Sequence, residues 1–572
     1  MDYFTRDGVI LRTGLSNKRD WYLLCIRELL DNSIDFLTKL YKGSEGMMIT
    51  TEIFKDNNFF HFKVRNPNPY PHRVFTNKRA IFDYEARAGT KQDLYVISRG
   101  MLGDAMKQIR AFGHILIQVD DYGDSFEDKQ WERPLIIRHN REEWELRLHL
   151  DKARQSATVT PKCTRKDLNH PDTEIEFTLP IPTYELCNDL TRACIVEFCQ
   201  KYPLFTTDIS FRFEITDNSS ASDTPGCMEA NVSKSKEIPS SLLTDFNCES
   251  PKATIVIEYK ALHPISTESW EKQNSVHAYT KEEFKRRFVN IDLDSIGYLE
   301  VYKILQTYRE GSNLRKTAEH ELTLAELSAL PEDKRNNRLE RFYNQLKEAL
   351  PPPEKLVLPY TTNREERKNV LIARLSHLYD NLDPDKNKAS YKSIHGKHMD
   401  DNNNTSYPYF FEILAVPFKD PRTADHNMVF IGSVNYSISP KENSNLFEGD
   451  YSKYIYDSDS YSTTKDIVGA LEAYGFSSYA HETAKIPCII IANLVTPKRK
   501  PHGQDKSSID ITPFEETFIQ AIKRLAADIK TYRALGIHFS TPSERGDAEY
   551  IESGRGKLEG LLTNYLRKEH GL

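Results

Sequence analysis

The sequence lacks the paired cysteines of zinc ribbons and redox dithiols. No CxxC pair occurs among its eight cysteines, and structural zinc sites and dithiol motifs both depend on such close pairs. The cysteines therefore indicate reduced thiols in a cytosolic protein. They are Cys25, Cys163, Cys187, Cys194, Cys199, Cys227, Cys248 and Cys488.

Long apolar runs are absent as well. The longest, PCIIIANLV at residues 487–495, is far shorter than the ~20 residues that a membrane-spanning helix requires. Near the start, Asp2, Arg6 and Asp7 interrupt the stretch that a signal peptide would keep apolar. We therefore expect no membrane partner and a cytoplasmic location. The alternative is a nucleoid location or, if the source is eukaryotic, a nuclear one.

An excess of positive charge is also missing. The formal net charge is −7, which argues against a surface covered with basic residues. DNA binding stays open, because local patches and not the net charge make phosphate contacts.

What the sequence does contain is enough apolar material for several globular domains. It has 572 residues, of which 39% are hydrophobic and 28% charged, and its mean hydropathy is −0.60. A chain of this length is expected to form more than one compact core. We predict domains at residues 1–265, 266–354 and 355–545, and a tail at 546–572.

The first predicted domain mixes helices with strands. A helix runs from a cap at Ser16 or Asn17 to a stop near Gly43, and a glycine-containing loop at 87–113 feeds a second helix. A third helix is predicted at 193–203 and a polar loop at 216–240. Strands are predicted at 47–55, 59–66, 114–119, 134–139, 144–150, 173–180, 208–215 and 253–260. These elements predict an α+β fold with an antiparallel or mixed sheet under helices.

The rest of the chain divides at a proline-rich segment. Residues 270–350 have a mainly helical pattern, which PPPEKLVLPY at 351–360 ends. The part beyond predicts a second α/β domain with long polar loops at 384–407 and 440–465. Its strands are expected at 409–418, 428–438 and 488–496, and its long helix at 514–534.

A polar stripe lies within the first predicted helix. Glu28, Asn32 and Asp35 are spaced by four and three residues, so they line one face, with Asp31 beside them. A solvated face would explain the charged members. Asn32 fits that reading poorly, because asparagine is a mediocre helix former and its amide oxygen is a good ligand for a hard cation.

A glycine-containing segment, SRGMLGDAMK at 98–107, is the second candidate. Gly100 and Gly103 would let the loop approach a ligand, and a helix that begins near Gly103 would direct free backbone N–H groups at it. Phosphate suits such a site, although an ordinary loop is the alternative. Lys107 would either add its charge or be solvated.

The order of these features resembles the Bergerat ATPase fold of gyrase, heat-shock chaperones, histidine kinases and mismatch-repair ATPases. ExxDNxxD at 28–35 resembles the first motif of that superfamily, and TEIEFTLP at 173–180 resembles the last, with Thr173 in the phosphate-contacting position. The helical insert and the α/β domain that follows it narrow the resemblance further. With them, the chain is most similar to the B-type, ATP-binding subunit of topoisomerase VI, the type IIB DNA topoisomerase. The resemblance extends, weakly, over most of the chain. It implies a Bergerat-type sandwich, a helical insert domain and a transducer-like α/β domain.

This resemblance implies a site for ATP and Mg²⁺. Asn32 would coordinate the magnesium ion, Glu28 would orient and deprotonate the attacking water, and Asp35 would support the site through hydrogen bonds. The glycine segment would hold the β and γ phosphates through Ser98, Arg99, Gly100, Met101, Leu102, Gly103 and Lys107. Lys506 is similar to the switch lysine that reaches the γ-phosphate, with a basic surface loop as the alternative.

One motif departs from the family pattern. Where the family has Asp-x-Gly-x-Gly, this chain has VRNPNPYP at 64–71. Asn66 would accept the hydrogen bond of the adenine amino group through its carbonyl oxygen. Pro67 and Pro69 stiffen the turn, and Asp172 replaces a glycine before Thr173.

The partners follow from the same resemblance. It implies an ATP-dependent homodimer with residues 1–15 as an exchanged strap, double-stranded DNA as a substrate, and a separate A-type subunit that carries the DNA-cleaving tyrosine. One alternative is a standalone ATPase of this superfamily that clamps or remodels DNA or protein without strand passage. Another is a nucleotide-binding scaffold that has lost turnover, against which the retained Glu28 counts.

Other motifs are set aside. SGRGKL at 553–558 lacks the spacing of a Walker motif. A polar loop explains His395, His398, Asp400 and Asp401 better than a metal site does. A solvated helix face accounts for Lys285, Arg286 and Arg287.

Overall fold

The computed structural model of the chain describes most but not all of its residues. The described residues are 4–13, 15, 18–41, 43–56, 58–67, 99, 105–118, 133–139, 141–151, 156–168, 172–181, 190–217, 254–265, 276–289, 300–302, 305, 321–349, 363–383, 389–400, 402–418, 428–439, 446–451, 466–474, 476, 488–498, 501–502 and 508–528. Among them, no helix is long and apolar enough to cross a membrane.

The chain folds into two compact units. The first holds the described residues of 1–360 together with 399–408 and 496–498, and the second holds those of 361–398, 409–495 and 499–572. The predicted boundaries at 265, 354 and 545 stay predictions.

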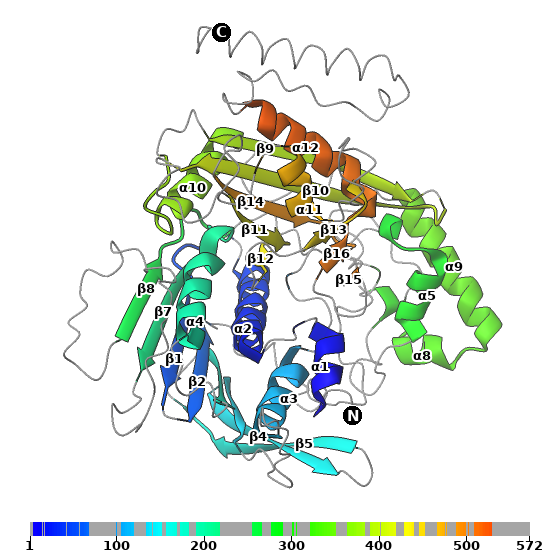
Figure 1. Cartoon of the computed structure of the whole chain (residues 1–572). Helices are drawn as coiled ribbons and strands as arrows, with labels where there is room; N and C mark the ends of the chain where they lie inside the picture. Colours follow the sequence, from blue (N-terminus) through cyan, green and yellow to red (C-terminus); the bar gives the residue numbers. More distant parts are fainter. Residues whose placement is uncertain are drawn as a thin grey trace, which may run out of the picture. The chain divides into compact units, whose positions relative to one another are not determined.

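The first unit is built on an eight-stranded sheet (Figure 1). Its strand order is β5-β4-β3-β6-β2-β1-β7-β8, and every neighbouring pair is antiparallel except β1 and β7, which are parallel. The strands are β1 Met48–Lys55, β2 Phe59–Asn66, β3 Leu135–His139, β4 Glu142–Asp151, β5 Ser156–Arg165, β6 Thr173–Pro180, β7 Ser210–Asp217 and β8 Thr254–Tyr259.

Helices cover one face of this sheet. They are α2 Lys18–Leu40, α3 Ala105–Gln118 and α4 Leu190–Lys201, with a short α1 at Arg6–Thr13. Helix α2 packs on β2, α3 packs on β6, and both α3 and α4 contact α2. The predicted α+β class is confirmed.

The helix-covered face is apolar because the strands alternate. On β2, Phe60, Phe62 and Val64 are buried, and on β6 Phe177 stacks on Phe62 with ring centroids 4.8 Å apart. Tyr22 of α2 is buried beside this stack, and its hydroxyl donates a 2.6 Å hydrogen bond to the Pro180 carbonyl. Aromatic burial of this kind dominates core stability.

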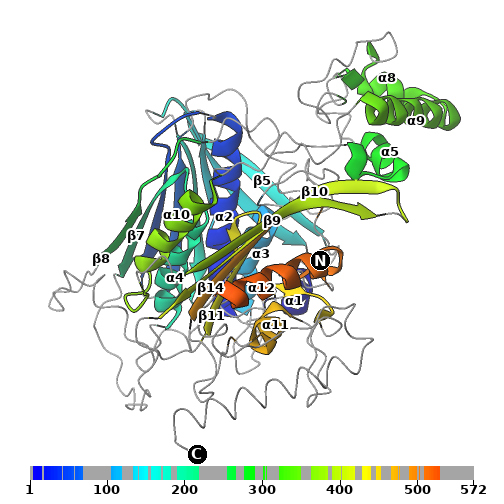
Figure 2. The ribbon, with the colours of Figure 1, turned by 90° about the horizontal axis from the view of Figure 1, so that it is seen from above.

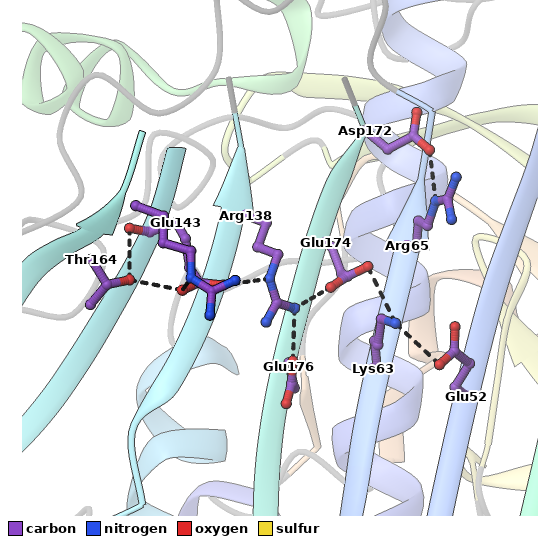
Figure 3. A network of polar contacts seen from close by, with 10 residues as sticks. Glu52, Lys63, Arg65, Arg138, Glu143, Thr164, Asp172, Glu174 and Glu176 are labelled. Carbon is purple, nitrogen blue, oxygen red and sulfur yellow. Dashed lines mark hydrogen bonds and ion pairs between the residues drawn. The ribbon is translucent and has the colours of Figure 1, made fainter. Parts of the chain in front are cut away.

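The opposite face carries ion pairs (Figure 3). Arg138 on β3 reaches Glu174 and Glu176 on β6 and Glu143 on β4, while Lys63 on β2 pairs with Glu52 on β1 at 3.1 Å. An antiparallel sheet commonly packs one face on its core and leaves the other to polar side chains. The alternation therefore fixes which side chains at the strand ends point toward the helices.

A small helical part also belongs to the first unit. It contains α5 Lys281–Val289, α8 Leu324–Ala329 and α9 Glu332–Ala349, which contact one another. Phe284 packs edge-on against Tyr343 with ring centroids 5.5 Å apart. Thr323 and Glu326 form a capping box at the start of α8.

The second unit holds a five-stranded sheet of order β12-β11-β14-β10-β9 and a small three-stranded sheet of order β13-β16-β15. The strands of these sheets are β9 Ser390–Asp400, β10 Thr405–Pro417, β11 Met428–Val434, β12 Ser437–Ile438, β13 Phe447–Glu448, β14 Cys488–Val495, β15 Pro501–His502 and β16 Ser508–Asp510. The adjoining ends of β9 and β10, within residues 399–408, are grouped with the first unit. Its helices are α10 Arg364–Ser376, α11 Ile467–Ala473 and α12 Glu515–Asp528.

Helices α10 and α12 cover opposite faces of the five-stranded sheet. Phe411 on β10 stacks on Phe518 of α12, with ring centroids 3.8 Å apart. The next residue, Glu412, points the other way and pairs with Arg367 of α10. Figure 2, which views the chain from above, shows α12 beside β10 and β14.

Three sequence predictions were wrong. Residues 114–118 form the end of α3 and not a strand, because Ile109, Phe112 and Leu116 recur at helical spacing and are all buried. The predicted strand at 428–438 is a hairpin of β11 and β12, turned at Asn435 and Tyr436, whose φ values are 51° and 65°. The predicted polar loop at 384–407 contains β9.

Candidate functional site

The polar stripe of α2 is not a solvated face. Asp31 and Asp35 are only 2% and 3% exposed, while Glu28 and Asn32 are half-buried. Asp31 and Asp35 are four residues apart, and so are Glu28 and Asn32, so each pair lies on one line along the helix. Helix α2 therefore carries a buried acidic row next to a half-buried row. Buried carboxylates are costly unless they are partnered, which makes their neighbours informative.

Asp35 is partnered by the glycine segment. Its Oδ1 accepts a 3.1 Å hydrogen bond from the backbone N–H of Arg99, and Arg99 itself is 4% exposed. Two motifs that are 64 residues apart in the chain therefore meet at this carboxylate. The acceptor lies on a long helix packed in the core, so it holds the backbone of Arg99 at a fixed place.

Asp31 is partnered by a residue that no sequence motif indicated. The hydroxyl of Tyr202 donates a 2.6 Å hydrogen bond to Asp31 Oδ1 across 171 residues. Burial, together with the charge of Asp31, raises the pKa of Tyr202 well above its ordinary value, and Arg99 opposes this rise. The hydroxyl thus remains a donor, and Asp31, Arg99 and Tyr202 form one buried electrostatic cluster with Asp35.

We expect Tyr202→Phe to destabilise the packing of α2 by about 1.5–3 kcal/mol, because it removes a donor from a buried charged acceptor. Amide hydrogen exchange of α2 measures this loss. Tyr259→Phe is the control, since that hydroxyl donates to the neutral Gln200 carbonyl at 3.0 Å and should cost about 0.5–1.5 kcal/mol. Equal losses in the two variants would contradict a special role for the Asp31 contact.

Glu28 lies in the more open row of α2. Its Oε1 accepts a 2.8 Å hydrogen bond from Nη2 of Arg27, and its side chain is 16% exposed. Asn32 follows one turn later in the same half-buried row of α2. A carboxylate and an amide are thus presented together on successive turns of α2.

A second polar group lies at the ends of three neighbouring strands. Asn66 ends β2, Thr173 begins β6 and His139 ends β3, and all three are buried. Asn66 and Thr173 are direct partners in the ladder of β2 and β6. Nδ1 of His139 lies 2.8 Å from Oγ1 of Thr173. Sequence reasoning missed His139, because a single histidine at a strand end carries no pattern.

The helix and strand groups belong to the same end of the first unit. Tyr22, near the start of α2, contacts the Pro180 end of β6. The helix ends at Leu40, a few residues before β1 begins at Met48, and β1 begins beside the Asn66 end of β2. The second half of α2 therefore lies toward the end of the sheet that carries Asn66 and Thr173.

Helix α3 adds buried basic side chains. Lys107, Arg110 and His114 are 1%, 4% and 4% exposed, and α3 contacts both α2 and β6. The solvated reading of Lys107 is therefore wrong. A buried lysine requires nearby negative charge or a ligand, which suits the end of the unit that holds the acidic row.

Several predicted site residues lie outside the described residues. They are Ser98, Gly100, Met101, Leu102, Gly103 and Lys506. The polar-loop interpretation of His395, His398 and Asp400 is wrong, because these residues belong to β9. No group of three histidine, cysteine, aspartate or glutamate side chains that could hold a metal occurs in the described ranges.

Comparison with known proteins adds little to what the residues themselves indicate. No protein-family model and no curated protein matches the sequence. Among solved structures, the ATPase region of Saccharomyces cerevisiae topoisomerase II is similar at 9% identity and a TM-score of 0.33, over 89% of this chain and 86% of that one. The same region bound to ICRF-187 (dexrazoxane) gives 8% identity and a TM-score of 0.32, over 90% and 85%. Scores this low do not establish a shared fold, so the functional assignment rests on the site residues.

Proposed function

We propose that the first unit binds ATP with Mg²⁺ in a Bergerat-type site and hydrolyses it. The observation that carries the proposal is the 3.1 Å hydrogen bond from the Arg99 N–H to Asp35. It joins the helix that would hold the metal to the segment that would hold the phosphates. Asn66 and Thr173, which are buried ladder partners at the same end of the sheet, would form a second side of the nucleotide site.

The chemistry assigned to each residue follows from its exposure and its partners. Asn32 would hold the magnesium ion through its amide oxygen, and the phosphates and water would complete the coordination. Bound magnesium would neutralise phosphate charge during transfer. Glu28, with one carboxylate oxygen held by Arg27 at 2.8 Å, would orient and deprotonate the attacking water. Arg99 and Lys107 would place positive charge near the phosphates, and Lys506 would report on the γ-phosphate.

At a finer level we propose a clamp similar to the B-type, ATP-binding subunit of topoisomerase VI. ATP would drive dimerisation, and a separate A-type subunit would cut double-stranded DNA. Phe4 and Leu15, within the proposed strap, are buried in the core of their own chain. Exchange of the strap would therefore have to replace these contacts with equivalent ones in the partner. The competing proposal is a standalone ATPase of the same superfamily.

The purified chain should release phosphate from ATP only when Mg²⁺ is present and should leave supercoiled DNA uncut. Steady-state phosphate release with and without a chelator measures the first point, and gel analysis of plasmid DNA measures the second. A chain that neither binds nor hydrolyses ATP would refute the proposed site.

A decatenation assay separates the clamp from the standalone ATPase. Interlinked DNA circles should be separated only when ATP and an A-type partner are both added. If pull-down and neighbouring genes give no such partner, the topoisomerase assignment is lost and the standalone ATPase remains.

A further inference from the structure

One row of side chains on the helix-covered face of the large sheet breaks the apolar pattern. Ile137, Ile175 and Val64 form a row across β3, β6 and β2. The next row toward the strand ends is His139, Thr173 and Asn66. Their exposed fractions of 1%, 7% and 4% show that the core encloses this polar row.

Such a row is not required for folding. Apolar side chains at these places would extend the core, whereas buried polar groups cost free energy unless each finds a partner. The three positions lie at strand ends, where a sheet most easily meets a ligand. The row therefore indicates a binding function at this end of the sheet.

Asn66 has a fixed orientation in the row. Its Nδ2 donates a 3.2 Å hydrogen bond to the Pro67 carbonyl, and a carbonyl oxygen can only accept, so the amide cannot be flipped. The Oδ1 atom is then the accepting side of the amide. This arrangement suits the exocyclic amino group of a 6-aminopurine.

Thr173 lies directly across from Asn66, where Cβ atoms of ladder partners are about 4.5–5.5 Å apart. A hydroxyl at this distance from Asn66 would face the nucleobase, in contrast to the phosphate contact that the family resemblance implies for Thr173. A threonine hydroxyl rotates freely unless a partner fixes it. Nδ1 of His139, at 2.8 Å, is such a partner.

We infer that His139 is a positioning residue of the nucleotide site, which holds the Thr173 hydroxyl toward the base bound at Asn66. The inference rests on the proposed function, since it assumes that ATP binds there. His139 does not touch the reacting atoms. It fixes the direction in which Thr173 presents its remaining hydrogen-bonding capacity.

The test compares nucleotide affinity among matched variants. His139→Leu should raise the Kd of ATP about tenfold, the effect of losing roughly one oriented hydrogen bond. His139→Asn, whose amide can occupy the place of Nδ1, should stay within about threefold of the wild type. Thr173→Val should raise the Kd of ATP by the same factor as His139→Leu. The double variant should bind ATP no more weakly than either single variant. Isothermal titration with ATP gives each Kd.

Ile137→Ala is the control for a purely structural effect. It lies on the same strand and face, and it should lower Tm at least as much as His139→Leu without changing the Kd of ATP. If the leucine variant does not fold, His139→Gln replaces it, because its longer side chain moves the amide away from the place of Nδ1.

The outcomes distinguish this inference from the proposed function. A wild-type chain that binds no ATP would overturn the proposed function and this inference with it. A wild-type chain that binds ATP while His139→Leu binds equally well would overturn only the role of His139. Additive losses in the double variant would also overturn it, because the two side chains would then act independently.

Discussion

A Glu412→Gln substitution is expected to weaken the five-stranded sheet of the second unit by about 3–5 kcal/mol, the cost of leaving a buried charge without its partner. Glu412 is 1% exposed and Arg367 is 3% exposed. The guanidinium donates from Nε and Nη2 to the two carboxylate oxygens at 3.0 and 2.8 Å. Removal of the carboxylate charge would leave this arginine buried between α10 and the sheet.

The rest of the network explains why no neighbour could compensate. The Tyr391 hydroxyl donates to Glu412 at 2.9 Å and Nδ2 of Asn493 donates at 3.1 Å. Oδ1 of Asn493 in turn accepts from Ser433 Oγ at 2.7 Å and from the Tyr436 N–H at 3.2 Å. Four hydrogen bonds, from Arg367, Tyr391 and Asn493, therefore end on the Glu412 carboxylate, and their donors would have to share or lose an acceptor.

Hydrogen exchange of the β10 and β14 amides measures the loss for this part of the chain alone. Glu516→Gln is the control, because Glu516 is exposed on α12. The double variant Arg367→Met with Glu412→Leu should lose less than Glu412→Gln, because it removes both charges and fills the space with apolar atoms. Equal protection in Glu412→Gln and the control would show that the pair adds nothing to stability.

The same pair predicts the direction of a pH effect. Burial raises the pKa of Glu412, but the charge and hydrogen bonds of Arg367 outweigh it and hold the pKa below its ordinary value. Stability from the pair is therefore fully present above the unfolded pKa of about 4.3 and is lost as the pH falls through the lower folded value. The difference between the wild type and Glu412→Gln should shrink below about pH 4.

The elements that the sequence could predict are those with a strong periodic pattern. The helix that carries Glu28 and the hairpin of β1 and β2 were predicted because their apolar residues recur at helical or alternating spacing. Gly43 ends that helix region with a φ of 75°, as expected for a left-handed terminator. Local pattern was sufficient for these elements, although it failed at residues 114–118 of α3.

Two of the longest missed strands lie at sheet edges. β5, with Pro161, and β9, with its histidines and lysines, are both edge strands. Edge strands tolerate proline and charge, since one side of the strand needs no ladder partner, so their sequences carry little strand pattern. Periodicity alone could not have separated them from loops.

The candidate site could be predicted only in part, because some of its contacts join residues that are far apart in the chain. The stripe on α2 has a local pattern, so Glu28, Asn32 and Asp35 could be selected from the sequence. Their partners could not, because Tyr202 lies 171 residues from Asp31 along the chain. His139 and Thr173 meet only because β3 and β6 are neighbours in the sheet.

Loss of the Glu28 carboxylate should have the largest effect on turnover. Glu28→Gln is expected to lower the rate of phosphate release by about 10²–10⁴-fold, the usual contribution of a general base. The Kd of ATP should change by less than about threefold, because the amide keeps the size of the side chain and can still contact Arg27. Single-turnover phosphate release, with titrations of the same samples, separates the two quantities.

The control for this experiment is Glu52→Gln. Glu52 is a glutamate of the first unit that pairs with Lys63 on the sheet face opposite the helices, so its loss should leave turnover unchanged. Equal phosphate release from the wild type and Glu28→Gln, with ATP still bound, would remove Glu28 from catalysis. The first unit would then be a nucleotide-binding scaffold, in which ATP acts by holding the Arg99 segment against Asp35 and not by being cleaved.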